Sequence, residues 1–306
     1  MNKVIRIGTR DSQLAVWQAN QVKQLLENNG YQSELVFVKS EGDTDLKTPL
    51  YEIGVQGIFT KVLDIALLNN EVDIAVHSMK DVPTILAEGL IQAAVLPRAS
   101  YKDILVPKNE VSFLDDTYSN AVIATSSTRR RAQWLNRYPN HTVENLRGNV
   151  NTRLRKVRDE NWHGAIFAAA GLERINLRPE NAVTLDWMLP APAQGAIMVV
   201  CRKDDTYSFE ASHRLNDEQT SICTKVERDF LRALLGGCTT PISALAERIG
   251  DTIVFKGNIL SLDGKKKATI NKNIEINKIE AAGKEIANEL LNNNGQEILD
   301  GIRNAK

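Results

Sequence analysis

The first hundred residues alternate between short apolar stretches and longer segments with helical periodicity. Residues 4–9 have the pattern of a strand, and Asp11 or Ser12 can cap a following helix that ends at Asn28-Asn29-Gly30. The same order then continues with a strand near 34–38, a helix at 60–69 and a strand at 73–77. Strands that alternate with helices predict an α/β lobe with a largely parallel sheet.

The pattern restarts at Ile104 and predicts a second α/β lobe. Its expected strands are 121–124, 142–146 and 165–168, and its expected helices are 128–138 and 150–160. Prolines and a glycine between 190 and 195 then break the chain before an apolar strand at 196–201. This strand precedes a polar stretch and can return to the first lobe, so the chain would cross twice between the lobes. Two crossings predict a hinge and an interlobe cleft.

The last third of the chain predicts a third, smaller α+β domain. A helix at 217–235 leads to strands at 253–260 and 268–276, joined through the hairpin signal Asp263-Gly264. A final helix, which begins near Ile279 and stops at 292–295, should lie on that small sheet. We therefore expect three domains: a discontinuous first lobe (1–98 and 195–213), a second lobe (102–190) and a C-terminal domain (217–306).

Composition excludes several classes of protein. With 306 residues, of which 42% are hydrophobic and 25% charged, the chain is typical of soluble globular proteins. No apolar run approaches the roughly 18 residues of a membrane-spanning helix, and no export signal is apparent. Cys201, Cys223 and Cys238 lie far apart, which favours neither a metal site nor a disulfide framework. A reducing cytosol is the expected compartment.

The net charge is zero, but one segment is strongly basic. Residues 129–158 contain eight arginines and Lys156 against the single acid Glu144, which is an excess of plus eight. Arginine grips carboxylate or phosphate bidentately, whereas a solvated face would use lysine and glutamate freely. We therefore expect an anion at this segment. The three lysines at 265–267, by contrast, follow a turn and are interpreted as a solvated hairpin edge.

Strand-to-helix junctions concentrate the candidate anion-binding groups. Thr125, Ser126 and Ser127 end a strand, and three arginines follow at the start of a helix, where they oppose the helix dipole unless an anion is near. A capped helix with a solvated basic turn is the alternative. Similar junctions hold Arg147, Asn149 and Arg153 in the second lobe and Arg10 and Ser12 in the first. Three such sites indicate one multiply charged ligand at the carboxyl ends of the strands, and phosphate and polycarboxylate both remain open.

Three further residues carry possible chemistry. Asp81 follows a first-lobe strand. A carboxylate held ionised among cations suits stabilisation of a cation, but from these residues alone a local ion pair with Lys80 or a cap is the commoner arrangement. His77 is expected to be a core histidine with its hydrogen bonds satisfied. Cys238 follows Gly236-Gly237, where missing side chains allow close approach of a bulky group. It could be an attachment point or simply a small loop residue.

Six motifs together resemble the porphobilinogen deaminase (hydroxymethylbilane synthase) family over essentially the whole chain. They are Gly8-Thr9-Arg10-Asp11-Ser12, His77-Ser78-Met79-Lys80-Asp81-Val82-Pro83, Thr125-Ser126-Ser127-Thr128-Arg129-Arg130, Leu146-Arg147-Gly148-Asn149-Val150-Asn151-Thr152-Arg153, Ala193-Gln194-Gly195-Ala196 and Gly236-Gly237-Cys238. The resemblance implies two lobes like those of periplasmic binding proteins and a C-terminal domain that carries the cofactor cysteine. It also implies a monomer in the cytoplasm that has neither nucleic acid nor membrane as a partner.

The resemblance further implies the activity and the residues that serve it. Four porphobilinogen molecules would condense, each losing ammonia, onto a dipyrromethane cofactor that the enzyme assembles from its own substrate and holds through Cys238, before hydrolysis releases hydroxymethylbilane. Asp81 would stabilise the cations, and Phe59 would cover the cofactor. The implied binders of the carboxylates are Arg10, Ser12, Lys80, Thr125, Ser126, Ser127, Arg129, Arg130, Arg147, Asn149, Arg153, Arg174 and Gln194.

One segment departs from the family pattern. The loop before Phe59 commonly carries two lysines, but here residues 52–57 read Glu-Ile-Gly-Val-Gln-Gly, so cationic assistance from this loop is not expected.

Two other classes of protein share parts of the pattern. A two-lobed binding protein would need no third domain with Cys238, and a nucleic-acid binder would need Trp134, Tyr138 and Trp162 exposed for stacking, whereas their apolar neighbours predict that they are mostly in the core.

Overall fold

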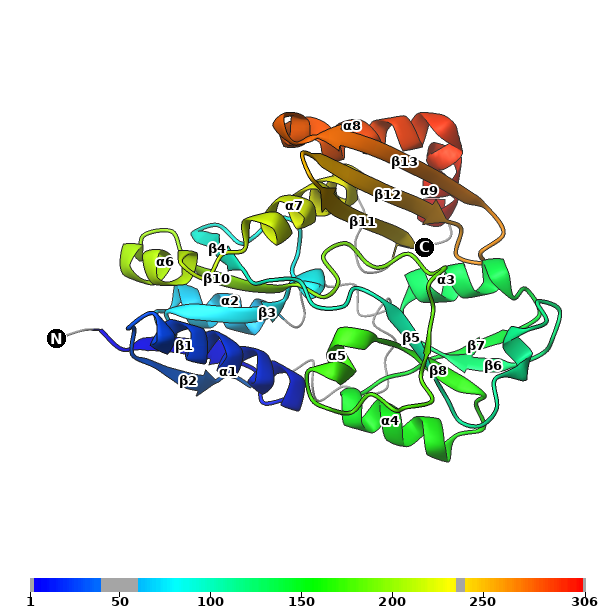
Figure 1. The fold of residues 1–306 in the computed structure, drawn as a ribbon, viewed down its shortest axis with the longest axis horizontal. Coiled ribbons are helices and arrows are strands. Elements are labelled where there is room, and N and C mark those ends of the chain that lie inside the picture. Colours follow the sequence, from blue (N-terminus) through cyan, green and yellow to red (C-terminus); the bar gives the residue numbers. More distant parts are fainter. Residues whose placement is uncertain (1–2, 40–59, 235–239, 305–306) are drawn as a thin grey trace. The chain divides into compact units, whose positions relative to one another are not determined.

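The computed structural model describes residues 3–39, 60–234 and 240–304. They divide into two compact units (Figure 1). The first takes the described residues within 1–45, 55–99 and 195–222, and the second takes those within 100–194 and 223–306. The second unit thus holds both the second lobe and the C-terminal domain.

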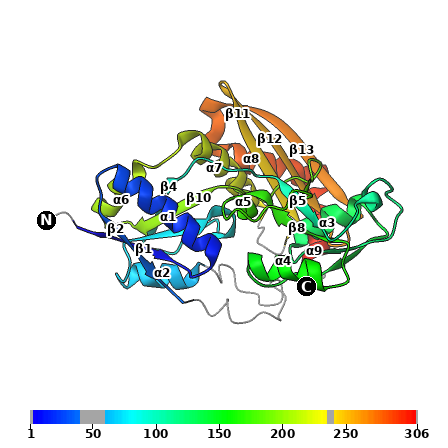
Figure 2. The ribbon, with the colours of Figure 1, turned by 60° about the horizontal axis from the view of Figure 1, so that its bottom comes forward.

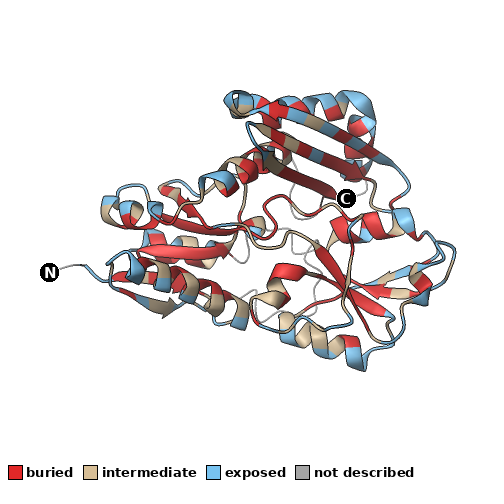
Figure 3. Ribbon diagram, in the orientation of Figure 1, coloured by how far each residue is buried: buried red, intermediate tan, exposed pale blue. Residues whose placement is uncertain are grey.

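The sheet of the first lobe has the strand order β2-β1-β3-β10-β4. The strand β1 (Ile5–Thr9) runs parallel to both β2 (Ser33–Phe37) and β3 (Ile74–Ser78). The strand β10 (Ile197–Arg202) runs antiparallel between β3 and β4 (Leu90–Val95). The late apolar strand therefore lies in the first sheet, as its sequence predicted. Figure 3 shows that β1, β3 and β10 are largely buried.

Three helices belong to this sheet: α1 (Gln13–Asn28), α2 (Lys61–Leu68) and α6 (Thr206–His213). The side chain of Ser12 caps α1 by accepting from the amide of Ala15, and apolar residues such as Val22 join the core beneath the helix. The helix α6 was not predicted, because a polar stretch was expected there. Asp205 caps it by accepting from the amide of Ser208 at 3.0 Å.

The second lobe repeats the plan of the first. Its strand order is β7-β6-β8-β5-β9, with three parallel strands followed by antiparallel pairing of β5 with β8 and β9. The strands are β5 (Asp103–Pro107), β6 (Val122–Ala124), β7 (Thr142–Glu144), β8 (Gly164–Ala168) and β9 (Val183–Thr184). Both lobes thus bring the carboxyl ends of three parallel strands to one edge, and Figure 2 shows both sheets from a second direction.

The helices of the second lobe are α3 (Thr128–Arg137), α4 (Val150–Asp159) and the short α5 (Ala169–Glu173). The aromatic residues near the basic segment lie in the core, as predicted. Trp134 and Tyr138 are buried, with ring centroids 4.9 Å apart, and Trp162 packs half-buried against the core around Phe167. Rings in these positions are not available for stacking on nucleotide bases.

The C-terminal domain is a three-stranded antiparallel sheet with helices, as expected, but the sequence missed two of its elements. The sheet consists of β11 (Ile242–Ile249), β12 (Thr252–Leu260) and β13 (Lys267–Glu275). The helices are α7 (Glu218–Ala233), α8 (Ile279–Leu290) and α9 (Gln296–Asn304), of which α8 packs on β13 and α9 on β12. The strand β11 and the helix α9 were not predicted.

Close contacts join the C-terminal domain to the second lobe. The turn glycine Gly264 has φ +74°, and a Cβ there would lie 2.5 Å from the carbonyl oxygen of Ala132 in α3. Asn136 Nδ2 donates to the Gly264 carbonyl at 2.7 Å, and the buried Gln133 donates to Ser243 of β11. The lysines at 265–267 in this hairpin are exposed, as expected. Only a residue without a side chain permits this approach of the hairpin to α3.

A buried carboxylate connects the parts of the second lobe. Asp103, the first residue of β5, has no exposed surface and accepts from Arg129 Nη2 at 2.8 Å. It also accepts from Arg130 Nη2 at 2.7 Å and from Gln194 Nε2 at 2.9 Å. The side chains of both arginines are more than nine-tenths buried. Arg130 also donates to the carbonyl of Ile166, so the cluster holds a strand, a helix start and the chain near 194 together.

A second buried carboxylate has the same function in the first lobe. Asp73 accepts from the backbone N–H of Arg6 at 2.9 Å and from its guanidinium at 3.0 Å. Lys3 lies 3.0 Å away and Arg202 Nη2 lies 3.5 Å away. These hydrogen bonds and charges outweigh the effect of burial and hold the pKa of Asp73 well below its usual range.

Cys201 and Cys223 are buried, as predicted, and burial raises the pKa of Cys201 to about 11. Cys238 lies outside the described residues. Among the helices of the described part of the chain, none has the length and apolar character that crossing a membrane requires.

Replacing Asp73 by asparagine should lower the free energy of unfolding by about 3 kcal/mol at pH 7, because the charge-assisted hydrogen bonds and ion pairs of a fully buried carboxylate are lost. The lowered pKa means that the native state keeps Asp73 ionised at pH values where the unfolded chain protonates it. The stabilisation is therefore present above about pH 4 and is lost as the pH falls further. Urea unfolding at pH 7 and pH 3 should show a difference between variant and wild type that shrinks in acid. The control is Asp204→Asn at a carboxylate that is 88% exposed, and an equal effect at that position would contradict the assignment.

Replacing Asp103 by alanine should cost about 3–5 kcal/mol, because two arginine charges would remain buried without their carboxylate. The matched control is Asp186→Ala, which removes an ion pair to Lys102 from a carboxylate that is 77% exposed and should cost less than about 1 kcal/mol. Chemical denaturation of both variants measures the difference. Similar losses in the two would mean that burial does not set the strength of the Asp103 cluster.

Candidate active site

The first lobe gathers polar groups where β1 and β3 end. These strands are neighbours, so Arg10, which follows β1, and the segment Ser78–Asp81, which ends β3, reach the same edge of the sheet. A small cavity lies there. Its lining residues are Arg10, Ser12, Leu14, Ala15, Gln18, Thr60, Leu63, Val76, His77, Ser78 and Asp81. The sequence predicted that Arg10, Ser12 and Asp81 share this edge, and the structure brings them to one cavity.

Gln18 is a cavity residue that the sequence analysis missed. It lies on α1, is buried, and donates from Nε2 to Ser78 Oγ at 2.9 Å. This hydrogen bond ties the first helix to the end of β3 and so fixes the start of the Met79–Asp81 turn. A glutamine on the buried face of an amphipathic helix was the available signal, because apolar residues are expected there.

Asp81 ends a single turn of 3₁₀ helix and is exposed. Within the described part of the chain, its carboxylate has no hydrogen bond or ion pair, so the alternatives of a pair with Lys80 or a cap are not adopted. The carboxylate therefore faces the cavity with its acceptor capacity unused. Such a group can accept N–H bonds from a ligand or stabilise a positive charge on it.

His77 differs from the expectation of a satisfied core histidine. It is 6% exposed, as a core residue would be, but its Nε2 atom is buried with no hydrogen-bond partner among the described residues. Burial, together with the nearby charge of Arg10, lowers the pKa of His77 to about 4. The imidazole is therefore neutral at pH 7, and His77 is one of the residues that line the cavity.

The second lobe gathers a comparable set of donors. Thr125, Ser126 and Ser127 follow β6, and Ser127 caps α3 by accepting from the amide of Arg130 at 3.4 Å. Thr125 is buried and accepts from the amide of Ser127 at 3.3 Å, which shapes the turn before the helix. The capped helix expected as the alternative interpretation is therefore present, and it begins directly beside the hydroxyls.

The neighbouring junction after β7 holds Arg147, Asn149 and Arg153. Gly148 between them has φ +109°, a left-handed conformation that turns the chain sharply into α4. Asn149 caps this helix by accepting from the amide of Thr152 at 2.9 Å, and Arg153 Nε donates back to the Gly148 carbonyl at 2.7 Å. Arg147 is buried. These hydrogen bonds hold a basic turn at the strand end, as the sequence predicted.

Arg174 follows the short helix α5, which begins directly after β8. Burial lowers its pKa to about 10, with a smaller opposing effect from Glu173. A guanidinium whose charge is penalised by burial is stabilised when an anion joins it. The site residues after β6, β7 and β8 thus lie at neighbouring strand ends.

Arg129, Arg130 and Gln194 bind a carboxylate of the protein itself. We expected an external anion because consecutive arginines at a helix start oppose its dipole, but the side chains of both arginines turn to Asp103. Gln194 likewise uses its amide on Tyr101 and Asp103. The anion that balances these two arginines is therefore a carboxylate of the protein itself. An acid at the start of an apolar strand is a sign in the sequence that Asp103 could be buried. The hydrophobic pattern cannot show, however, that its partners are arginines 26 and 27 residues further along the chain.

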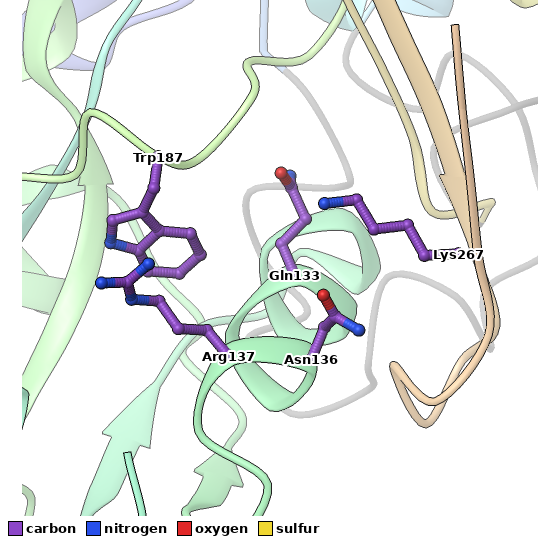
Figure 4. A pocket seen from close by; sticks show the side chains of 5 residues that line it. All are labelled: Gln133, Asn136, Arg137, Trp187 and Lys267. Atoms are coloured by element: carbon purple, nitrogen blue, oxygen red, sulfur yellow. The ribbon is translucent and has the colours of Figure 1, made fainter. Parts of the chain in front are cut away.

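A second cavity, of about 270 Å³, lies where the C-terminal hairpin approaches α3 (Figure 4). Gln133, Asn136 and Arg137 line it from α3, together with Trp187 and Lys267. The guanidinium of Arg137 stacks over the Trp187 ring, 5.0 Å from its centroid, and Gln133 is occupied with the backbone of Leu189. Two of these residues, Gln133 and Asn136, donate the hydrogen bonds that join the second lobe to the C-terminal domain.

Three features of the sequence analysis lie outside the described residues. They are Phe59, Cys238 and the altered loop 52–57. Their predicted roles are unchanged.

Comparison with known proteins identifies the family. Residues 5–210 match the family model described as "Porphobilinogen deaminase, dipyromethane cofactor binding domain", and residues 221–292 match "Porphobilinogen deaminase, C-terminal domain". A probable porphobilinogen deaminase of Methanocaldococcus jannaschii is 43% identical over 94% of this chain and all of its own length. A porphobilinogen deaminase of Desulforamulus reducens is 40% identical over 99% of both chains.

Two solved structures of binding proteins are also similar to part of this chain. An ancestral cationic amino acid solute-binding protein is 16% identical and covers 69% of this chain and 87% of its own, with a TM-score of 0.45. The methionine-binding protein MetQ is 12% identical, with a TM-score of 0.43 and coverage of 69% and 89%. The fold of this chain, from its own sheets, is two α/β lobes with a small C-terminal α+β domain. By its family models and by relatives that match it from end to end, the chain belongs to the porphobilinogen deaminase family.

Proposed function

We propose that the protein condenses four porphobilinogen molecules, with loss of ammonia at each step, onto a covalently held dipyrromethane and then releases linear hydroxymethylbilane by hydrolysis. The observation that carries the proposal is the Asp81 carboxylate, which has no partner among the described residues and lines a cavity with Arg10 and Ser12. A substrate with two carboxylates and a pyrrole N–H matches both kinds of group.

The residues present fit a cofactor that carries several carboxylates. Arg147 is a buried guanidinium, and burial penalises the charge of Arg174, so an anionic ligand would stabilise both. We propose that Cys238 holds the dipyrromethane through a thioether. We assign carboxylate binding to the donors at the strand ends of the two lobes, which are Arg10, Ser12, Lys80, Thr125, Ser126, Ser127, Arg147, Asn149, Arg153 and Arg174.

Arg129, Arg130 and Gln194 have a different role in this proposal. Their donors to Asp103 hold the start of α3 and the chain near 194 in place, so Ser127 and the first turn of α3 keep their orientation. We therefore assign them mainly to positioning, with direct carboxylate binding limited to donors that Asp103 does not use. Phe59 is proposed to cover the cofactor.

The proposed chemistry assigns the central role to Asp81. Loss of ammonia from porphobilinogen leaves a cation delocalised over the pyrrole, and an ionised carboxylate beside it lowers the energy of that charge. The same carboxylate accepts the pyrrole N–H and orients the ring. When bound, the dipyrromethane supplies the nucleophilic carbon. Arg10 and Ser12 hold the substrate carboxylates away from Asp81, which would otherwise repel them.

The oligomeric state, the compartment and the domain division are also proposals. We propose a monomer in a reducing cytosol, with the three-domain division at 1–98 and 195–213, 102–190, and 217–306. The nucleic-acid alternative is disfavoured because Trp134 and Tyr138 are buried. A pure binding protein would use the arginines but would need no third domain with Cys238.

The first test is the intact mass of the purified full chain with and without porphobilinogen. The proposed function predicts a stable increment of about two pyrrole units at Cys238, followed by a ladder of one-unit additions. Cys238→Ser should lack the stable increment, whereas Cys223→Ser, at a buried cysteine away from the glycine loop, should retain it. A wild-type mass that never changes in the presence of substrate would refute the proposal.

The second test is Asp81→Asn. Asparagine keeps the shape of the side chain but removes its charge, so turnover should fall by roughly 100- to 1,000-fold, while the increment at Cys238 remains. Asp115→Asn changes an exposed aspartate in the second lobe and should leave turnover unaltered. Turnover of Asp81→Asn close to that of the wild type would exclude Asp81 as the residue that stabilises the cation.

A further inference from the structure

The chain makes a tight turn at residues 191–194, next to the Asp103 cluster. The backbone N–H of Gln194 donates to the carbonyl of Ala191 at 2.9 Å, which closes the turn. Pro192 is its second residue, and Ala193, its third, has φ +60°. A positive φ at the third position is typical of a type II turn, where glycine is favoured. An alanine in this conformation is strained, so its surroundings must hold it there.

A buried glutamate accepts the N–H of this alanine. Glu227 lies on α7 and has no exposed surface, and its Oε2 atom accepts from the backbone N–H of Ala193 at 2.6 Å. The peptide before the third residue is the one that reverses its direction between a type I and a type II turn. In a type I turn, the N–H of Ala193 would point away from the carboxylate. Glu227 therefore stabilises the type II form.

The second oxygen of the same carboxylate holds a strand of the C-terminal domain. Its Oε1 atom accepts from the backbone N–H of Ala246 in β11 at 2.7 Å. Both hydrogen bonds are short, as expected for bonds to a carboxylate. Glu227 thus links the turn to two elements that flank Cys238 in the sequence, because α7 precedes this cysteine and β11 follows it.

The turn also leads directly to the support of the second-lobe donors. Gln194, its last residue, donates to Asp103 at 2.9 Å, and Asp103 accepts from Arg130 in the first turn of α3. The same helix start is capped by Ser127, one of the proposed carboxylate binders. The conformation of the turn therefore determines whether Gln194 reaches Asp103.

We propose that Glu227 is a positioning residue: its carboxylate selects the type II turn at Ala193 and thereby couples the elements that flank Cys238 to the carboxylate-binding donors of the second lobe. Glu227 contacts neither substrate nor cofactor in this assignment and acts through Gln194 and Asp103. Its effect on turnover rests on the proposed function, whereas its effect on the turn does not.

The experiment removes the acceptor and then removes the strain of the turn. In Glu227→Met, a side chain of similar length accepts neither N–H, so the turn should leave the type II form and turnover should fall about tenfold or more, because misplaced groups are costly even away from the chemistry. Adding Ala193→Gly should restore turnover by about threefold or more, since glycine adopts a positive φ without strain. Ala193→Gly alone should leave turnover within about twofold of the wild type.

The matched control is Ala191→Gly in the same turn. Ala191 is not among the residues with a positive φ, so a glycine there should restore nothing in Glu227→Met. If Glu227 only stabilised the fold, Ala193→Gly would shift the melting temperature equally with and without Glu227 and would not restore turnover. Recovery with both glycines alike, or with neither, would overturn the proposal.

Hydrogen–deuterium exchange separates this inference from the proposed function. In Glu227→Met, the amides of 191–194 and of the start of α3 should exchange about tenfold faster, and adding Ala193→Gly should reverse the change. The amides of β1 and β3 in the first lobe should be unaffected. This pattern is expected even if the wild type shows no mass ladder with porphobilinogen, in which case only the proposed function fails. Unchanged exchange at 191–194 would exclude Glu227 as the group that holds the turn.

A conservative variant covers the case in which Glu227→Met does not fold. Whichever way the amide of Glu227→Gln is turned, its NH2 group faces one of the two N–H donors, so one of the two links is lost. Turnover and exchange should then change in the same directions by smaller factors, and Ala193→Gly should again restore them. Wild-type turnover and wild-type exchange in Glu227→Gln would contradict the proposal.

Discussion

The carboxylate of Asp103 is the group on which the second lobe depends. It has no exposed surface, and three side chains from two distant segments donate to it. Because an unpaired charge cannot remain in such a place, the acid and its arginines must be buried together or not at all. The cost of burying them is offset only if every donor is aimed correctly. The start of α3 and the chain near Gln194 are therefore fixed by electrostatics as much as by apolar packing.

This constraint divides the basic segment into two groups. Arg129 and Arg130 point inward to the carboxylate of the protein, and the arginines of the next junction, Arg147 and Arg153, stay at the strand ends. An excess of plus eight therefore overstates the charge available to a ligand, since one buried acid from outside the segment balances part of it. The inner arginines make the helix start rigid, and the outer ones can respond to an anion. Affinity for a polycarboxylate depends on both, because donors that are already oriented lose little entropy on binding.

The sequence predicted the parts of the fold that are expressed in local patterns. Alternating strands and helices located the parallel strands of the first and second sheets, and the late apolar strand β10 was recognised as a return to the first sheet. Asp81, Arg10 and Ser12 were placed on one edge because parallel strands end together. The pairing of Asp103 with α3 was not predictable, because the periodicity of apolar residues does not show which charged residues pair. The lack of a partner at His77 was not predictable either, because it is a property of everything around the ring. The helix α9 was missed because a polar run ending in glycine gave a strong stop signal just before it.

The two buried acids also show why the same kind of residue has different consequences for the site. Asp73 immediately precedes β3, at the end of that strand opposite to Ser78 and Asp81, so its partners Lys3, Arg6 and Arg202 stabilise the lobe far from the cavity edge. Asp103 opens a strand that runs antiparallel to β8, and its register partner is Ala168, the last residue of β8. It therefore lies at the edge where the donors of the second lobe gather. Strand direction alone makes one carboxylate a purely structural anchor and the other part of the support of the binding edge.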